Sequence, residues 1–292
     1  MNIQPDNRPH VVIVGGGVGG LSAAWYLRNH ARCTVLEAGD CWGGKVYTHQ
    51  IDFDGGPLNV ETGPDGFITR KPWAYDLVQE LGLADQAIGV NKLPERIYVL
   101  RRGKLVSLPQ GLHLLVPTQI LPFLRSPLLS WPGKLRVLAE RFIPAKTEDA
   151  DESLADFVTR RLGAEALHNL AEPMLGGVYN ANPNQQSILA TFPQFRRMEA
   201  EHGSLIKGMR AAMQARAARP ATDKPELIAF KDGMRVLVDA LVDQLPADMF
   251  LDTPVQTIQP VLEGGYDVFV DEDSPIYADA VILVHAEKMV DH

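Results

Sequence analysis

Two short apolar runs flank a stretch of helical spacing near the beginning of the chain. Val11–Val14 is a continuous apolar run that ends at a cluster of glycines, and Cys33–Leu36 is a second run of the same kind. Between them, apolar residues recur at the spacing of one helix face: Leu21, Ala24, Leu27 and Ala31. This order of patterns predicts a strand, a helix and a second strand, the βαβ unit of an α/β domain.

Further along the chain, the pattern changes character twice. Ile97–Leu100 and Leu105–Leu108 flank a polar turn and predict a hairpin. Prolines at 117, 122, 127 and 132 restrict the leucine-rich stretch after Gly111 to short pieces, whereas Glu152–Leu175 and Gly203–Arg219 have helical patterns. After residue 225 one helix and four strands are predicted: strand Leu227–Phe230, helix Met234–Leu245, and strands Val255–Ile258, Gly265–Val270 and Asp279–Val284.

A chain of 292 residues is long enough for about two domains. The return of strand patterns after residue 225 predicts an interrupted α/β domain, in which residues 1–75 and 225–292 share one sheet. Residues 76–224 would be a mostly helical α+β insert. Its apolar stretch from Leu112 to Leu138 has two interpretations. It packs the insert's own core and a ligand cavity, or it forms a shallow face that contacts a membrane, with Lys134 and Arg136 at the edge.

The glycines after the first strand point to a ligand. Gly15, Gly17 and Gly20 complete the pattern G-x-G-x-x-G at a strand-to-helix junction. The first glycine permits a tight turn, the second leaves room for a pyrophosphate, and the third lets the helix pack closely. Glu37 follows 22 residues after Gly15, at the end of the second strand, where a carboxylate can accept a hydrogen bond from a ribose hydroxyl. The combination predicts dinucleotide binding rather than an ordinary βαβ turn.

Composition and charge narrow the alternatives. The net charge of −8, with no basic arm or stripe, argues against nucleic acid as a partner. Two cysteines, Cys33 and Cys41, form neither a disulfide framework nor a metal site, and predict a reducing cytoplasm. The polar first ten residues predict no signal peptide, and no run of about 20 apolar residues suggests a transmembrane helix. We find no metal-ligand spacing among the histidines and no nucleophile motif.

A second glycine pair separates flavin from nicotinamide binding. Gly43-Gly44-Lys45 lies six residues after Glu37, an element that nicotinamide domains do not need. At this point the chain resembles the flavoprotein superfamily of amine oxidases, carotenoid desaturases and protoporphyrinogen oxidases. In that superfamily an arginine usually follows the pair, and Lys45 keeps its charge without the bidentate fork. The alternative for the glycine pair is an ordinary loop turn.

Other segments resemble one branch of this superfamily, the bacterial protoporphyrinogen and coproporphyrinogen oxidases. Two of these segments follow the glycine pair: Val60–Phe67 and Arg70–Trp73. Four more lie in the insert, in the order of that family: Phe157–Gly163, Glu172–Tyr179, Ala190–Phe195 and Glu201–Gly208. Amine oxidases and desaturases share the motifs of the first 66 residues but not these. The resemblance covers nearly the whole chain.

The resemblance implies an FAD-binding, Rossmann-like (two-dinucleotide-binding) domain interrupted by a substrate domain. It also implies removal of six electrons from a porphyrinogen, protoporphyrinogen IX or coproporphyrinogen III, in haem biosynthesis. FAD accepts the electrons, and oxygen reoxidises it with release of hydrogen peroxide. The residues that would hold FAD are Gly15, Gly16, Gly17, Val18, Gly19, Gly20, Glu37, Ala38, Gly43, Gly44, Lys45, Gly63, Pro64, Asp65 and Val255.

The remaining implications concern the substrate and the chain's surroundings. Porphyrinogens carry propionates, so Arg70 and Lys71 are candidate anchors, with a solvated basic pair at a helix start as the alternative. Asp65 either faces the flavin ring or caps the next turn. Peripheral contact with the inner face of a membrane and a homodimer are further expectations. Members of the family continue beyond the length seen here and contain a late glycine–aspartate motif. The alternative to an active oxidase is therefore an inactive fragment that holds FAD weakly, or another amine-oxidase-like FAD oxidoreductase.

Overall fold

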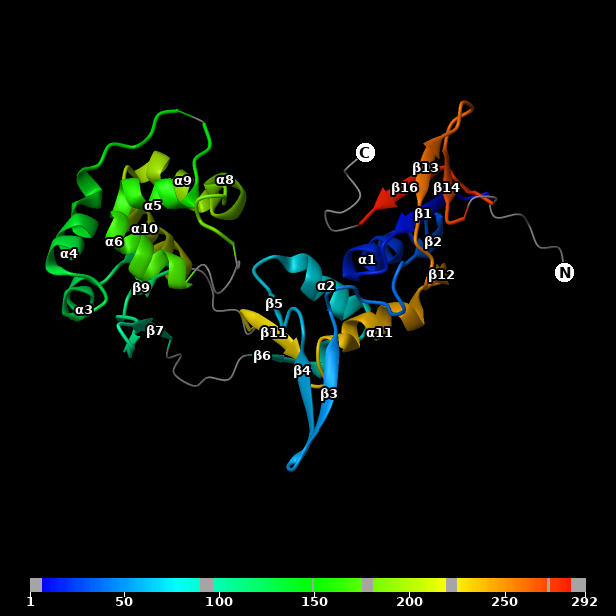
Figure 1. The fold of residues 1–292 in the computed structure, drawn as a ribbon, viewed down its shortest axis with the longest axis horizontal. Helices are drawn as coiled ribbons and strands as arrows, with labels where there is room; N and C mark the ends of the chain where they lie inside the picture. The colour runs from blue at the N-terminus through cyan, green and yellow to red at the C-terminus, as the bar shows by residue number, and fades with distance from the viewer. Residues whose placement is uncertain are drawn as a thin grey trace. The chain divides into compact units, whose positions relative to one another are not determined.

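The computed structural model describes residues 7–89, 97–148, 150–174, 181–218, 225–271 and 274–284. The chain divides into two compact units (Figure 1). The first unit contains Met1–Lys92 and Thr222–His292, and the second contains Leu93–Ala221. We expected the first boundary at residue 75, but it lies after residue 92. A helix that continues to residue 80 packs in the core of the first unit, and a strand at residues 87–89 pairs within the same unit.

The first unit is built on a four-stranded parallel sheet with the order β12-β2-β1-β16. These strands are His10–Val14 (β1), Arg32–Leu36 (β2), Asp248–Phe250 (β12) and Ala280–Leu283 (β16). Val12 of the central strand lies opposite Thr34 on one side and Val281 on the other. All five residues of β1 are buried, as its continuous apolar run predicts. The predicted βαβ unit is confirmed, whereas the three-residue strand β12 was not predicted.

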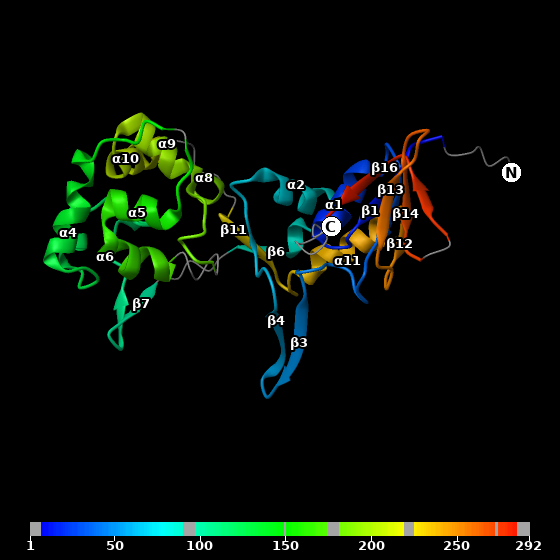
Figure 2. The ribbon, with the colours of Figure 1, turned by 45° about the horizontal axis from the view of Figure 1, so that its top comes forward.

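Helices cover one face of this sheet and a second, smaller sheet covers the other (Figure 2). The helices α1 (Val18–Leu27) and α11 (Arg235–Gln244) pack with the side chains of Ile13 and Val35. On the opposite face, Val12 and Leu36 contact the antiparallel sheet of β13, β14 and β15. Its strands are Thr257–Pro260, Tyr266–Phe269 and Ile276–Ala278. Strands from both ends of the chain therefore share the central sheet, as we predicted, whereas β13, β14 and β15 form a separate sheet that was not predicted.

Three further groups of elements complete the first unit. The hairpin of β3 (Thr48–Phe53) and β4 (Gly56–Glu61) extends away from the other strands (Figure 1). A small antiparallel sheet has the order β5-β11-β6. Its strands are Phe67–Ile68, Leu227–Phe230 and Ala87–Gly89. The helix α2 (Pro72–Glu80) and the 3₁₀ turn η1 (Ala84–Gln86) connect β5 to β6 and bury Leu77 and Val78 with α1 and α11.

The second unit is mostly helical, with two small hairpins. The hairpins are β7–β8 and β9–β10, with strands Tyr98–Arg101, Lys104–Ser107, Leu112–His113 and Val116–Pro117. The helical segments are α3 (Ile120–Arg125), α4 (Trp131–Leu138), η2 (Ala139–Phe142), α5 (Leu154–Leu162), α6 (Ala164–Ala166), η3 (Leu167–Ala171), α8 (Ile188–Thr191), α9 (Pro193–His202) and α10 (Leu205–Ala217). Four of these helices begin after a serine whose hydroxyl accepts a backbone N–H of the first turn: Ser130, Ser153, Ser187 and Ser204.

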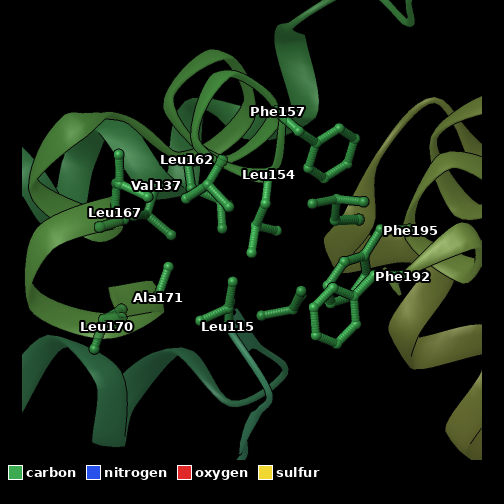
Figure 3. Packing of buried hydrophobic residues seen from close by; sticks show 14 of the residues in the cluster. Leu115, Val137, Leu154, Phe157, Leu162, Leu167, Leu170, Ala171, Phe192 and Phe195 are labelled. Atoms are coloured by element: carbon green, nitrogen blue, oxygen red, sulfur yellow. The ribbon is translucent and has the colours of Figure 1, made fainter. Parts of the chain in front are cut away.

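One apolar cluster holds this unit together (Figure 3). Leu154 of α5 points toward Leu115, and Phe157 of the same helix points toward Phe195. The rings of Phe157 and Phe195 stack with centroids 6.2 Å apart. Leu115, Val116, Phe123 and Val137 belong to this cluster, which supports the interpretation of the stretch from Leu112 to Leu138 as core.

Two basic residues of that stretch do not have the position we expected. Lys134 is buried and donates from Nζ to the carbonyl of Leu124 at 2.9 Å. The guanidinium of Arg136 donates to the carbonyls of Arg160 and Arg161 at 2.7 and 3.0 Å, at the C-terminal end of α5. A cation is favourable there because the last helical carbonyls have no partner within the helix. Neither residue is therefore free to line the edge of a membrane-contacting face.

Candidate functional site

The first glycine turn has the geometry that its sequence predicts. Gly15 has a φ of +111°, a backbone conformation that is strained for any residue with a side chain. Its N–H donates to the carbonyl of Leu36 at 2.8 Å. A Cβ on Gly20 would lie 1.9 Å from the carbonyl oxygen of Gly15 and 3.3 Å from Ile13 Cγ2. The third glycine is thus required for α1 to approach the turn and strand β1.

Gly17 differs because open space adjoins it. Its φ of −70° suits any residue, and the nearest atoms to a Cβ there would be 3.9 Å away, on Gly43 and Gly44. Gly17 also precedes α1, whose N-terminus has no side-chain cap and no acidic residue in its first turn. The first N–H groups of α1, from Val18, Gly19 and Gly20, are therefore available for an anion. This combination of space and unpaired donors fits a pyrophosphate.

The second glycine pair packs directly on the first turn. The N–H of Gly43 donates to the carbonyl of Gly16 at 2.9 Å, and Gly17 and Gly43 form an isolated bridge. Gly43 and Gly44 have φ of +110° and +59°, so both positions favour glycine. A Cβ on Gly44 would lie 3.2 Å from Gly17 Cα. The pair is therefore a second wall of the same site.

Trp42, which the motif does not include, closes one side of this arrangement. A Cβ on Gly16 would lie 2.4 Å from the indole ring of Trp42, so the ring packs closely against the turn. A tryptophan directly before a glycine pair is the sequence signal that could have identified this contact. Cys41, the preceding residue, is free and half-buried, and burial and Asp40 raise the pKa of its thiol. A raised pKa disfavours the reactive thiolate.

Glu37 and the segment that leads to Val255 are linked through backbone hydrogen bonds. Glu37 Oε2 accepts from the N–H of Gly16 at 2.6 Å, and Glu37 Oε1 accepts from Gly39 N–H at 2.8 Å. The backbone of Glu37 bonds to Phe250 and Thr253, which brings Val255 to the same edge of the sheet. Val255 is buried and precedes β13, and its backbone N–H and C=O have no partner among the described residues. These groups are free to hydrogen-bond a base. Ala38 is exposed beside them.

The loop after β4 lies against the second glycine pair. A Cβ on Gly63 would lie 1.8 Å from the carbonyl oxygen of Lys45, which shows how closely the two segments approach. Pro64 and Asp65 follow and are exposed, as is the side chain of Lys45. The N-cap residue of the following helix, α2, is Lys71. Asp65 remains open to solvent at the end of this loop.

Arg70 and Lys71 lie at the start of α2, just after β5. Both side chains are exposed, and neither has a hydrogen bond or ion pair among the described residues. Their exposure agrees with a solvated basic pair, and it also leaves both cations available to a carboxylate ligand. In the described part of the chain, no group of three or more His, Cys, Asp and Glu side chains could hold a metal ion.

The motifs of the insert build a buried ion-pair network that sequence reasoning did not foresee. Arg161 and Glu140 are fully buried and form an ion pair, and Glu140 also accepts from Ser204 Oγ at 2.7 Å. Glu199, also fully buried, accepts from Arg160 at 2.6 Å and Arg196 at 2.7 Å. Burial raises the pKa of the Glu199 carboxyl, but the hydrogen bonds from the two arginines outweigh this and hold its pKa below the usual range. Part of the motif Glu172–Tyr179, after residue 174, lies outside the described residues.

These features define a nucleotide-binding α/β unit, and comparison with known proteins identifies its class. The chain belongs to the family of flavin-containing amine oxidoreductases, whose family model matches residues 18–283. It is 36% identical over 94% of its length to a coproporphyrinogen III oxidase of Propionibacterium freudenreichii, of which it covers 56%. It is 34% identical over 97% of its length to the coproporphyrinogen III oxidase of Bacillus subtilis, of which it covers 61%. The chain thus spans somewhat more than half the length of these relatives.

Solved structures agree on the fold. A candidate protoporphyrinogen oxidase of Exiguobacterium sp. 255-15 superposes with a TM-score of 0.78 at 32% identity, covering 96% of this chain and 60% of that one. Putrescine oxidase superposes with a TM-score of 0.61 at 22% identity, over 96% of this chain and 58% of that one. The first is closer in sequence and in structure than the second. In the described residues, no helix is long and apolar enough to cross a membrane.

Proposed function

We propose that the first unit holds the adenosine-diphosphate part of FAD between the two glycine loops. The observation that carries the proposal is the open space at Gly17, which lies between the uncapped N-terminus of α1 and Gly43-Gly44. The N–H groups of Val18, Gly19 and Gly20 would bind the pyrophosphate. Glu37 would accept from the ribose hydroxyls, and the backbone of Val255 would meet the adenine. Lys45, Gly63, Pro64 and Asp65 would adjoin the flavin end.

We further propose that the protein oxidises a porphyrinogen to the porphyrin, with oxygen as the final electron acceptor. FAD, when bound, supplies the redox chemistry by accepting electron pairs from the substrate. The chain's residues bind and orient the cofactor. Coproporphyrinogen III is the favoured substrate, because the relatives with 34–36% identity carry that name and those named protoporphyrinogen oxidase have 24–32%.

The proposed substrate contacts are Arg70 and Lys71, whose exposed cations would bind propionate groups. The helical unit, Leu93–Ala221, is proposed as the substrate domain. Exposed apolar side chains on α3 and α4, among them Leu121, Trp131 and Leu135, support contact with a membrane surface. Cosedimentation of the chain with lipid vesicles tests this contact, and loss of cosedimentation in Trp131→Ser would identify the surface.

The decisive experiment adds FAD and then a porphyrinogen to the purified chain. Bound flavin, porphyrin fluorescence and hydrogen peroxide are the expected products of an active oxidase. Coproporphyrinogen III and protoporphyrinogen IX are compared at equal concentrations, and faster oxidation of the former supports the favoured substrate. A chain that binds no FAD would refute the cofactor proposal, and flavin binding without porphyrin formation would refute activity of this chain alone.

For the substrate anchors, the double variant Arg70→Gln/Lys71→Gln should raise KM for the porphyrinogen about tenfold or more and leave FAD affinity unchanged. The loss of charge-assisted hydrogen bonds to a propionate is the physical reason. The variant Arg102→Gln is the matched control, because it removes an exposed cation from the turn of the β7–β8 hairpin. Equal KM values in all three proteins would exclude Arg70 and Lys71 as anchors.

A further inference from the structure

Glu61, the last residue of β4, has an environment that neither the glycine motifs nor the proposed cofactor contacts explain. Its carboxylate oxygens lie 2.9 and 3.0 Å from Thr48 Oγ1, and Oε1 accepts the N–H of Met234 at 2.8 Å. Thr48 Oγ1 in turn accepts from Arg235 N–H at 3.1 Å. Two backbone donors at the start of α11 are thus satisfied by a strand pair 170 or more residues away in sequence.

The approach of the two segments leaves no spare room. Gly233, directly before Met234, has a φ of +97°, and a Cβ there would lie 2.4 Å from Thr48 Cγ2 and 2.9 Å from Glu61 Oε1. The glycine therefore allows the start of α11 to reach the carboxylate. Glu61 and Thr48 are both half-buried, so the contact is shielded from bulk water.

The strand β4 and the helix α11, which Glu61 links, each contact one loop of the proposed site. Immediately after Glu61, the N–H of Thr62 donates to the carbonyl of Tyr47 at 3.1 Å, and Gly63 packs on the carbonyl of Lys45. One turn into α11, the methyl groups of Val238 would lie 3.1 and 3.2 Å from a Cβ on Gly43. The first turn of α11 therefore braces the glycine pair from one side, while Glu61 ties that turn to the loop from Thr62 to Asp65.

We infer that Glu61 is a positioning residue for the flavin nucleotide. Its carboxylate fixes α11 and the loop after β4 relative to each other, and thereby holds Gly43-Gly44 and Gly63-Pro64 in register around the cofactor. Glu61 acts through these loops and is not placed against the ligand. The inference rests on the proposed function, because it assigns Glu61 a role in that same site.

The test compares Glu61→Ala, Glu61→Asp and Thr48→Val with the unchanged chain. We expect Glu61→Ala to weaken FAD binding by about tenfold or more, since displaced positioning groups have effects of this order. We expect Glu61→Asp to recover part of the affinity, because a carboxylate can still reach the α11 donors. Thr48→Val, which removes only the hydroxyl, should have a smaller effect, and the double variant Glu61→Ala/Thr48→Val should be less than additive.

Asp239→Asn is the matched control, because it removes a carboxylate from the exposed side of the same helix, where Asp239 pairs with Arg235 at 2.8 Å. Flavin absorbance and fluorescence in the bound state provide a readout of ring environment that a loss of overall stability does not change. Unaltered affinity and an unaltered flavin spectrum in both Glu61→Ala and Thr48→Val would overturn the inference. The milder Thr48→Val keeps the test valid if Glu61→Ala does not fold.

Hydrogen exchange of the FAD-free chain separates this inference from the proposed function. Glu61→Ala should accelerate exchange of the Met234 and Arg235 amides and of residues 43–46 and 62–65, and Asp239→Asn should not. If the unchanged chain binds no FAD, the proposed function and the assigned role fail together. If the unchanged chain binds FAD and the exchange of both loops is the same in Glu61→Ala, only the role of Glu61 fails.

Discussion

Gly17 and Gly20 lie three residues apart in one turn, but the atoms around them differ completely. At Gly20 the backbone of the same turn occupies the space of a side chain, whereas at Gly17 that space is open. The requirement for glycine at position 20 therefore comes from the fold. At position 17 the fold imposes no such requirement, and a requirement for glycine there would come from a ligand.

The first prediction uses this contrast. Gly17→Val should lower the free energy of unfolding of the FAD-free chain by no more than about 1 kcal/mol, because its φ is ordinary, a Cβ meets no atom closer than 3.9 Å, and the remaining cost is that of valine at a helix N-cap. The same variant should lose measurable FAD binding, since its side chain would occupy the space assigned to the pyrophosphate. Fluorescence titration with FAD and thermal unfolding of the FAD-free chain measure the two effects separately.

Gly20→Ala provides the opposite case. Its methyl group would lie 1.9 Å from the Gly15 carbonyl oxygen, so the turn must shift, at a cost of about 1–3 kcal/mol or more in the free energy of unfolding. Chemical denaturation should show that loss without added FAD. Normal FAD affinity in Gly17→Val would show that the first turn does not hold the cofactor, whatever happens in Gly20→Ala.

At the scale of the elements, buried charges join four helical segments of the second unit. Glu140 of η2 pairs with Arg161 of α5 and accepts from Ser204 and from the N–H of Leu205 at the start of α10. Glu199 of α9 pairs with Arg160 and Arg196. The arginines of the motif Phe157–Gly163 and the serine of the motif Glu201–Gly208 thus stabilise the packing of the helices.

The second prediction is a large loss of stability in Glu140→Gln. Removing the charge of Glu140 leaves Arg161 with only its longer ion pair to Glu199, a carboxylate shared with Arg160 and Arg196, and breaking a buried pair in this way costs up to about 3–5 kcal/mol. Two features bear on the remaining contacts of Arg161: its Nε has no partner among the described residues, and its second ion pair, to Glu199 Oε1, is longer at 3.4 Å. Urea denaturation measures the change. Asp239→Asn, in an exposed pair, should change stability by less than about 0.5 kcal/mol, and equal effects in the two variants would contradict the prediction.

The third prediction concerns pH and Glu199. Because its folded pKa is below the value in the unfolded chain, its contribution to stability is present above the unfolded pKa. That contribution is lost as the pH falls through the folded pKa. The free energy of unfolding of the second unit should therefore decrease from pH 5 downward more steeply in the unchanged chain than in Glu199→Gln. Urea midpoints at a series of pH values measure the slope, and the exposed Glu201→Gln should keep it. Identical slopes in the unchanged chain and Glu199→Gln would refute the assignment.

Local patterns predicted the elements that are held by local contacts. Strand β1, the glycine turn and α1 follow directly from the order of residues in 11–31, and the β7–β8 hairpin follows from its polar turn. Strand β12 was missed because Asp248–Phe250 has no alternation and is defined by its bonds to β2 and by the N–H of Glu37 donating to Phe250. Likewise, Lys134 and Arg136 are bound by carbonyls distant in the sequence, which no local pattern indicates.

At the scale of the whole molecule, each apolar cluster found among the described residues draws its members from one unit. The cluster of the second unit contains residues between Val99 and Met209 only. The two clusters of the first unit draw on residues from both ends of the chain, such as Val11 with Val238 and Val12 with Val268. Each unit therefore has its own core, and the two cores should lose their structure in separate transitions.

The fourth prediction is that FAD stabilises one of these transitions. A ligand that binds only the folded first unit at 100 times its Kd adds about 2.7 kcal/mol to the stability of that unit. Calorimetry of the unchanged chain should show two transitions, with FAD raising the melting temperature of one. Glu140→Gln should lower the melting temperature of the other, and Gly17→Val should abolish the shift caused by FAD. If FAD raises both transitions equally, or if Glu140→Gln lowers the transition that responds to FAD, then the units do not unfold independently and the cofactor site cannot be assigned to the first unit alone.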